Sequence, residues 1–487
     1  MISINKQVAK GAAWMIALRV VLKVIGFLST VFLARLLSPE DFGLIAIIMA
    51  FFAMIEIFGS FSFDTVLIQK RDATPADYNT AWSFNVAFGI LACLTVAMGG
   101  GAVADFYDDQ RIEPIMMVLS LLFLIAGFQN IGVVEFRKNL TFEKEFRFQL
   151  IPKLAGTFFT LGLAFWLRNY WALVLGSLIW KALVLLNSYV LHEFRPRFTF
   201  SEWRHLFRFS KWLMINNLFY FLNNRSPEMI IGKILSPQAA GFFAIAQEIS
   251  TMPTSEVAAN VTAATYPGYC KVSHLPAELK KMYLVVMESI SFFVLPAGIG
   301  VASLAEVLVP VVLGSKWLAS VPLVQYLALA GVLIAISSNT GSVFMAMGRP
   351  RISTMMGLLR VFMLIPMIFW LSAESGLDGV AQAILVTAVV TFIVSNGFIY
   401  VGLKIPIKSI GRIYIRPLSA SLLMAMCVHW GLLMLSQFHN GVVALMTLVL
   451  LGVLSYTLST MLLWWLTGCA DGPEKKLFDL TCRKLRS

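Results

Sequence analysis

The sequence predicts an all-α integral membrane protein with about 14 transmembrane helices, built as two structurally similar halves. Hydrophobic residues make up 59% of the 487 residues and charged residues only 13%, and the mean hydropathy is +0.80. A water-soluble fold of this length cannot bury so much apolar surface, so the lipid bilayer must solvate it. The spacing of long apolar stretches and an internal repeat indicate the same fold class.

Apolar stretches recur along the whole chain, each long enough to cross a hydrocarbon core roughly 30 Å thick. We expect spans at residues 12–34, 42–68, 80–104, 115–134, 150–167, 170–191, 212–233, 240–265, 283–304, 321–347, 355–373, 379–403, 415–435 and 442–466. Only Arg168 and Asn169 separate the fifth span from the sixth. Glycine and proline inside several spans are tolerated where neighbouring helices satisfy the freed backbone groups.

A short motif occurs twice, 198 residues apart. Residues 33–47 read LARLLSPEDFGLIAI, and residues 231–245 read IGKILSPQAAGFFAI. The shift pairs Leu37 with Leu235, Ser38 with Ser236, Pro39 with Pro237, Gly43 with Gly241, Ala46 with Ala244, Ile47 with Ile245 and, upstream, Trp14 with Trp212. Two copies of one motif in a membrane protein predict two similar helical halves around a substrate site. Because both copies begin on the same side, the halves should be parallel repeats rather than inverted ones.

The distribution of Lys and Arg residues over the loops predicts the orientation of the chain in the membrane. With the N-terminus inside, 28 of the 38 Lys and Arg residues fall in loops or at span ends on that side, five in loops or at a span end opposite, and five deeper within spans. This excess marks the cytoplasmic side, so both termini are expected there. The net charge of +12 then reflects topology. The basic residues are scattered rather than clustered with aromatic residues, so nucleic acid is not an expected partner.

Soluble-enzyme signatures and metal spacings are missing from the sequence. It holds no Walker A motif, no G-x-G-x-x-G and no H-E-x-x-H. The five cysteines are isolated, without C-x-x-C or Cys/His metal spacing. We therefore expect no catalytic residues, no metal site and no bound cofactor, apart from coupling to Na⁺ or H⁺.

Two bases share one face of the first span. Arg19 and Lys23 are four residues apart and lie about 10 Å and about 16 Å along the helix from Ala12. A base at the centre of a span costs roughly 2.5–3.5 kcal/mol, so it usually faces a cavity or a partner. The pair indicates an anion-binding surface. The alternative is that both bases reach the inner surface beside a carboxylate such as Glu56.

The seventh span is the repeat mate of the first and is more polar. Asn216 and Asn223 are seven residues apart, as are Asn217 and Asn224, which predicts one wide polar face. The alternative is that this face only holds helices together through hydrogen bonds.

Arg225 lies near mid-depth of the same span, and Pro227 should kink the helix because it cannot donate to the carbonyl of Asn223. Glu228 lies one turn beyond Arg225 and is its expected partner. Arg225 therefore joins Arg19 and Lys23 as a candidate ligand of an anionic substrate.

Other ionisable groups also lie within spans. Lys181 is deep in the sixth span and is a further substrate-binding candidate. Glu56, Glu228, Glu248 and Glu256 are candidate coupling-ion ligands. Arg360 lies near the start of its span and is expected to reach the membrane surface.

The inner segment 192–211 reads HEFRPRFTFSEWRHLFRFSK and links the two repeats. From Ser201 onward it has the pattern of an amphipathic helix at the membrane surface. It would contact anionic lipid, or it is the ordinary basic and aromatic collar of a cytoplasmic loop.

Several short motifs resemble one known family. They are Lys10-Gly11-Ala12 with Trp14, Leu33-Ala34-Arg35, Phe42-Gly43-Leu44, Leu67-Ile68-Gln69, Leu313-Gly314-Ser315-Lys316-Trp317 and Ala346-Met347-Gly348-Arg349-Pro350. Their order and spacing over about 350 residues resemble the polysaccharide-transport branch of the MOP superfamily. The similarity is greatest to Wzx-type flippases of lipid-linked oligosaccharides, in the colanic-acid exporter group.

This resemblance implies a MOP/MATE-like fold of two six-helix lobes around a central cavity. The N-lobe would be residues 1–195, a cytoplasmic linker helix 196–211, the C-lobe 212–410, and two more helices with a cytoplasmic tail 411–487. Many relatives have a single Asp near the middle of the seventh span, where this chain has Pro227-Glu228.

The resemblance also implies a function. The chain would export undecaprenyl-pyrophosphate-linked oligosaccharide repeat units across the bacterial inner membrane by alternating access, for exopolysaccharide, capsule or lipopolysaccharide biosynthesis. Its partners would be this substrate, membrane lipids, and the polymerase and glycosyltransferases of the pathway.

Two alternatives remain open. A MATE-type small-molecule or drug antiporter would need buried carboxylates and few buried bases. An integral-membrane glycan polymerase or ligase would need a long outer loop, but the longest expected outer loop, 105–114, is short.

Overall fold

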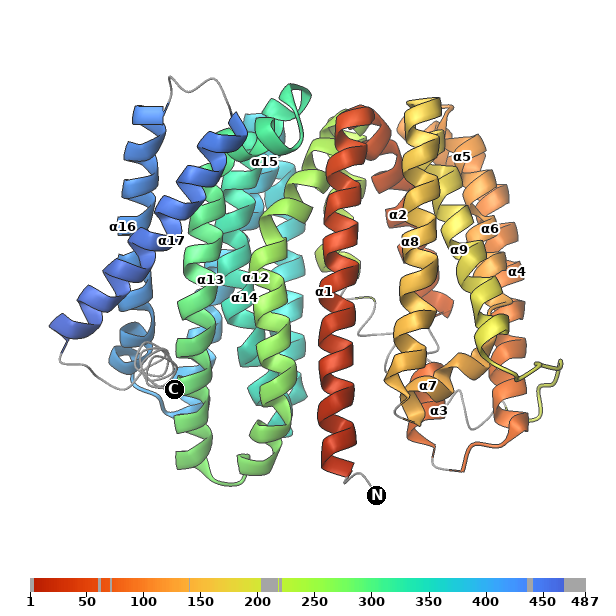
Figure 1. Cartoon of the computed structure of the whole chain (residues 1–487), viewed down its shortest axis with the longest axis horizontal. Helices are drawn as coiled ribbons and strands as arrows, with labels where there is room; N and C mark the ends of the chain where they lie inside the picture. Colours follow the sequence, from red (N-terminus) through yellow and green to blue (C-terminus); the bar gives the residue numbers. More distant parts are fainter. Residues whose placement is uncertain are drawn as a thin grey trace. The chain divides into compact units, whose positions relative to one another are not determined.

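The structure is a computed structural model that describes residues 4–59, 63–70, 72–139, 141–202, 218, 221–435 and 441–467. Within these residues the regular structure is helical throughout (Figure 1). The chain is therefore the all-α membrane protein that the sequence predicts. Nine of the described helices are long and apolar enough to cross a membrane. A tenth span results if the pair 112–127 and 131–138, bent by 66°, is counted as one.

Chain contacts divide the protein into two compact units, Met1–Gly241 and Phe242–Ser487. The helices of the first unit are α1 (Ile4–Leu36), α2 (Pro39–Gly59), α3 (Phe63–Gln69), α4 (Pro75–Tyr107), α5 (Ile112–Leu119), α6 (Leu121–Gly127), η1 (Ile131–Val134), α7 (Glu135–Lys138), α8 (Phe142–Leu167), α9 (Trp171–Leu191) and α11 (Ser226–Ile234). The unit boundary places α11 with the first unit, although the sequence assigned it to the C-lobe. The division into two six-helix lobes remains a prediction.

The second unit is also helical. It contains most of α12 (Pro237–Val272), then α13 (Pro276–Val312), η2 (Ser315–Ser320), α14 (Val321–Ala346), α15 (Pro350–Leu403), α16 (Ile407–Leu435) and α17 (Gly441–Leu466). The last two helices pack on α13, where the Tyr456 hydroxyl donates to the carbonyl of Phe292 at 2.7 Å (Figure 1).

Two spans expected at 355–373 and 379–403 meet in α15 at a sharp break. Gly376 has φ +59° and ψ −130°, which glycine adopts without the strain that a side chain would add. Gly379 lets the chain pack closely after the break, because a Cβ atom there would overlap the carbonyl oxygen of Leu371. The positive φ of Gly376 thus allows the chain to turn at this point.

Close helix packing in the first unit depends on small residues. A Cβ atom on Gly156 of α8 would lie 2.8 Å from the Cβ atom of Trp180 on α9. A Cβ atom on Gly176 would overlap the side chain of Thr160. These contacts place α8 and α9 side by side and antiparallel, as expected for spans joined at Arg168, which has φ +51°.

The linker between the repeats begins differently from the prediction. Residues 192–200 are extended rather than helical, and 201–202 form a turn. The backbone N–H of Arg197 donates to Asn79 Oδ1 at 2.8 Å, and that of Thr199 donates to Ser83 Oγ at 2.9 Å. The polar side chains of α4 thus replace the hydrogen bonds that a helix would have supplied. The expectation of helix across 196–202 was wrong.

Aromatic rings fix the same segment to α4. The ring of Phe198 lies 4.7 Å from that of Trp82, and the ring of Phe200 lies 5.0 Å from that of Phe84. The rest of the predicted amphipathic helix, from residue 203, lies outside the described residues.

Candidate site: a cationic level in the first unit

Two contacts set the register between α1 and α8. The rings of Trp14 and Phe146 lie 4.9 Å apart, and nearer the C-terminal ends of both helices Leu33 packs with Ala164. The chain advances 19 residues between these contacts on α1 and 18 on α8, so the helices run parallel side by side. Lys153 on α8 therefore falls between the levels of Arg19 and Lys23 on α1.

The packing of α8 on α9 extends this level to a third helix. Because Gly156 meets Trp180 and Gly176 meets Thr160, residue 181 of α9 lies level with residue 155 of α8. Lys181 is therefore level with Lys23. We call Arg19, Lys23, Lys153 and Lys181 the cationic level. They lie within about 8 Å of depth, since a helix rises about 1.5 Å per residue.

Trp180 lies beside two of the three lysines of this level. The ammonium nitrogens of Lys153 and Lys181 lie 5.7 Å and 6.0 Å from the centroid of its ring. Such distances allow a cation–π attraction that helps to hold two like charges at one depth. Trp180 remains 40% exposed, so a ligand can still reach the ring.

Lys153 is the functional candidate that the sequence analysis missed. The fifth span is expected at 150–167, so Lys153 lies at its very start and was counted with the basic residues of the preceding cytoplasmic loop. Helix α8 actually begins at Phe142, eight residues earlier. Lys153 is therefore about 16 Å along the helix. The helix pattern of residues 142–149 could have revealed this, but their charges concealed it.

The side chains of Arg19 and Lys23 on α1 are both exposed, as a substrate-binding role requires. The candidate carboxylate Glu56 on α2 is also exposed and attracts the ammonium group of Lys181 electrostatically. Glu56 thus lies within electrostatic range of Lys181.

The polar part of the seventh expected span, which precedes α11, is only partly described. Asn216 and Asn217 lie outside the described residues, and Asn223 and Asn224 are half-buried. The helix is interrupted at Arg225, and α11 restarts at Ser226 with proline in its first turn, where a missing N–H costs nothing. The break at the Pro227 region agrees with the predicted kink.

Arg225 and Glu228 form the ion pair that the sequence predicts. Arg225 Nη1 lies 3.3 Å from Glu228 Oε1. Glu228 is buried, with its side chain 6% exposed, whereas the side chain of Arg225 is 48% exposed. One guanidinium therefore neutralises a buried carboxylate and still presents donors to a ligand. The convergence of Arg225 with Arg19 and Lys23 stays a prediction.

The two remaining acidic candidates lie on α12 in the second unit. Glu248 is exposed and Glu256 is half-buried. Their role as coupling-ion ligands stays a prediction.

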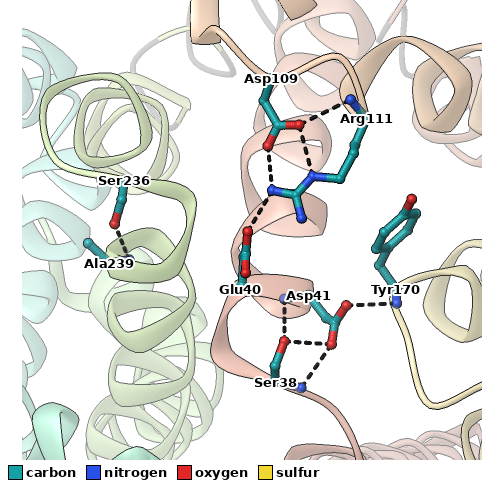
Figure 2. Close-up of polar contacts among 8 residues, drawn as sticks. All are labelled: Ser38, Glu40, Asp41, Asp109, Arg111, Tyr170, Ser236 and Ala239. Atoms are coloured by element: carbon teal, nitrogen blue, oxygen red, sulfur yellow. Dashed lines mark hydrogen bonds and ion pairs between the residues drawn. The ribbon is translucent and has the colours of Figure 1, made fainter.

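The repeated motif begins equivalent helices in both copies. The Ser38 hydroxyl accepts from the N–H of Asp41 at 3.2 Å, and the Ser236 hydroxyl accepts from that of Ala239 at 3.1 Å (Figure 2). Both serines are N-caps, a role suited to a short side chain with an acceptor oxygen. The sequence repeat is thus a structural repeat.

The first copy carries an additional carboxylate. Asp41 Oδ2 accepts from the N–H of Ser38 at 2.9 Å, and Asp41 Oδ1 accepts from the N–H of Tyr170 at 2.9 Å (Figure 2). This side chain joins the start of α2 to the start of α9. Ala239 in the second copy cannot do so.

Glycine allows the two copies of the motif to meet. A Cβ atom on Gly43 would overlap the carbonyl oxygen of Pro237 and lie 2.8 Å from the N atom of Gly241. A Cβ atom on Gly241 would overlap the carbonyl oxygen of Pro39 and lie 2.9 Å from the N atom of Gly43. The contact is reciprocal, as expected for elements related by a two-fold rotation.

Polar groups reinforce the same end of the first unit. The Tyr107 hydroxyl donates to the carbonyl of Met229 at 3.0 Å, and Lys233 Nζ lies 3.0 Å from Asp108 Oδ2. Both contacts join the end of α4 to α11.

Arg111 joins the loop after α4 to α2. Its Nη2 atom lies 2.6 Å from Glu40 Oε1 and 2.7 Å from Asp109 Oδ2 (Figure 2). Hydrogen bonds from Arg111 lower the pKa of Asp109, and partial burial opposes this shift. We call the contacts made by Tyr107, Lys233 and Arg111, together with those of Gly43 and Gly241, the outer junction.

Comparison with known proteins identifies the family. Residues 32–322 match the family described as "Polysaccharide biosynthesis protein". The chain belongs to this family. It is 24% identical over 401 residues to the lipopolysaccharide biosynthesis protein WzxC of Escherichia coli K12, covering 81% of each chain. It is 23% identical over 470 residues to the succinoglycan biosynthesis transport protein ExoT of Rhizobium meliloti, covering 94% of this chain and 93% of the relative.

Solved structures support the predicted fold. The lipid II flippase MurJ in its inward closed conformation superposes with a TM-score of 0.76 at 15% identity, covering 93% of this chain and 99% of that one. An inward-facing multidrug MATE transporter of the MOP superfamily gives a TM-score of 0.59 at 16% identity, covering 79% and 95%. The predicted MOP/MATE-like fold is therefore confirmed.

Proposed function

We propose that this family member is a flippase that moves undecaprenyl-pyrophosphate-linked oligosaccharides from the cytoplasmic to the periplasmic leaflet of a bacterial inner membrane. The cationic level is the observation that carries the proposal. A pyrophosphate cannot enter hydrocarbon unaided, and bases at mid-depth replace its hydration. The names of one relative, a succinoglycan biosynthesis transport protein, and of one structural neighbour, a lipid II flippase, support the same class.

The bases and the aromatic ring suit different parts of this substrate. Arg19 and Arg225 can each offer a planar fork to two phosphate oxygens, whereas a lysine acts as a mobile point charge. Trp180 offers an exposed, rigid apolar face beside Lys153 and Lys181. The Asn223 and Asn224 amides suit sugar hydroxyls. The protein itself would change no bond in the substrate.

Alternating access requires that one end of the cavity be closed while the other is open. We propose that the outer junction is the periplasmic gate. Its contacts join α2 and α4 to α11 and the start of α12, and outward opening would have to break them. With this orientation both termini are cytoplasmic. Glu56, Glu228, Glu248 and Glu256 remain the proposed ligands of a coupling Na⁺ or H⁺.

A drug antiporter is the second candidate. It would take cations, for which several bases at one level are unfavourable because like charges repel. The buried Glu228 is the feature that favours it, but Arg225 already neutralises that carboxylate.

The test is transport in proteoliposomes that contain a fluorescent lipid-linked oligosaccharide. Wild-type protein should move the lipid to the opposite leaflet, and K153Q and K181Q should lower the rate at least ten-fold. K144Q, which changes an exposed lysine of α8 near its start, serves as the control. Transport of cationic dyes without transport of the lipid would favour the antiporter instead.

A further inference from the structure

Arg360 lies on the packed face of α15, in the second unit, and not on its lipid-facing side. Its neighbours one turn away in each direction, Met356 and Leu364, are 8% and 2% exposed. The opposite face carries Met355 and Phe362, which are 55% and 74% exposed. The side chain of Arg360 itself is half-buried. That Arg360 reaches the membrane surface stays a prediction.

No described residue neutralises this guanidinium. Arg360 has no ion pair or hydrogen bond within residues 4–59, 63–70, 72–139, 141–202, 221–435 and 441–467. The facing helix α14 cannot supply a carboxylate, because its sequence contains neither Asp nor Glu. A half-buried charge on the packed face of a helix is unfavourable without a partner, so an external counter-charge is expected.

Open space lies beside the side chain. Gly357 is on the same face, one turn toward the start of α15, and a Cβ atom there would meet nothing within 4 Å. Helical side chains tilt toward the helix N-terminus, so Arg360 leans over this turn. An anion can therefore occupy the space that the missing side chain of Gly357 leaves.

Two serine hydroxyl groups of α14 lie at the level of Gly357. A Cβ atom on Gly341 would lie 3.1 Å from Ser353 Oγ, which fixes the antiparallel register of α14 and α15. In this register Ser337 and Ser338 are level with Gly357. Their hydroxyls donate to carbonyls of their own helix at 2.7 Å and can rotate toward a ligand.

From these observations we infer that Arg360 is the centre of an internal anion site that takes the phosphate or pyrophosphate group of a lipid. A guanidinium offers two parallel donors to such a group, and serine hydroxyls complete its coordination. The site is distinct from the cationic level, which belongs to the first unit. The inference does not rest on the proposed transport function, because it requires only that a phosphate-bearing lipid binds.

The test uses full-length protein in an uncharged detergent and native mass spectrometry to count bound lipid. The probes are undecaprenyl pyrophosphate and phosphatidylglycerol, each titrated against wild type, R360M, R360K and R351M. Arg351 is an exposed base on the same helix and serves as the control. R360M should lose one bound lipid or bind it at least ten-fold more weakly, and R351M should match wild type. R360K should be intermediate, because lysine keeps the charge without the fork.

The two probes distinguish the source of the phosphate. Dependence on Arg360 for undecaprenyl pyrophosphate alone would identify a carrier-lipid site, and dependence for phosphatidylglycerol alone a membrane-lipid site. In addition, lipid-free R360M should unfold at a higher temperature than lipid-free wild type, since it lacks the unpaired charge. Equal binding of both probes by wild type, R360M and R360K would overturn the inference and leave the proposed transport function intact.

Discussion

Gly43 and Gly241 occupy equivalent positions in the two copies of the repeat, and each lies against the backbone of the other copy. Neither position has room for a methyl group, because the nearest atoms belong to the main chain and cannot rotate away. The outer junction therefore depends on two glycines that are far apart in the sequence.

Substitution of either glycine by alanine should prevent the junction from closing. We expect G43A and G241A each to reduce glycan export at least ten-fold, because the added Cβ atom overlaps a carbonyl oxygen. The measurement is export by a deletion strain that expresses each variant at the wild-type level. G26A and G99A are matched controls, since a Cβ atom at either position meets nothing within 4 Å. Normal export by G43A and G241A would refute the proposal that the outer junction is the periplasmic gate.

Removal of the first N-cap should cost more stability than removal of its repeat mate. S38A should destabilise the protein by about 1–2 kcal/mol and S236A by about 0.5–1 kcal/mol. The difference arises because Ser38 also donates to Asp41, the residue that holds Tyr170. Chemical unfolding in detergent measures both values. Equal losses would show that the additional carboxylate contributes nothing.

The ion pair of Asp109 should make stability depend on pH in the acid range. Hydrogen bonds from Arg111 lower the pKa of Asp109 in the folded state, so the unfolded chain takes up its proton first as the pH falls. The stabilisation is complete above the unfolded value of about 3.9 and disappears as the pH falls through the lower folded value. The difference in unfolding temperature between wild type and D109N should therefore be constant well above about pH 4 and shrink steadily as the pH falls below it. A difference that does not shrink below about pH 4 would contradict this origin.

The orientation can be tested by cysteine labelling in intact cells. Cysteine at Gln110 or Ser315 should react with an impermeant reagent from outside, whereas cysteine at Ser201 should not. The reason is the excess of Lys and Arg in the loops on the N-terminal side. Labelling of a cysteine at position 201 from outside would show that the orientation in the membrane is the opposite of the one proposed.

The fold class, the repeat and most span positions follow from the sequence, because hydropathy and motif spacing are local patterns. The Arg225–Glu228 ion pair could also be predicted from the sequence, since one helical turn separates the two residues. Lys153 was missed because hydropathy places a span boundary at the first apolar residue, whereas α8 begins in charged sequence.

Features that depend on tertiary packing could not be predicted. The extended start of the linker is fixed by Asn79 and Ser83 of α4, more than 100 residues away. The place of Arg360 on the packed face of α15 depends on which face of α15 meets α14. No local pattern encodes either choice.

The central claim is that bases at mid-depth bind the pyrophosphate of the substrate. The most direct measurement is proteoliposome transport of a lipid-linked oligosaccharide by the triple variant R19A/K23A/R225A, with insertion and unfolding temperature checked in the same preparation. The account predicts a well-folded protein that transports at the protein-free rate, and partial recovery when Arg225 is replaced by Lys in place of Ala. Wild-type transport by a well-folded triple variant would contradict it.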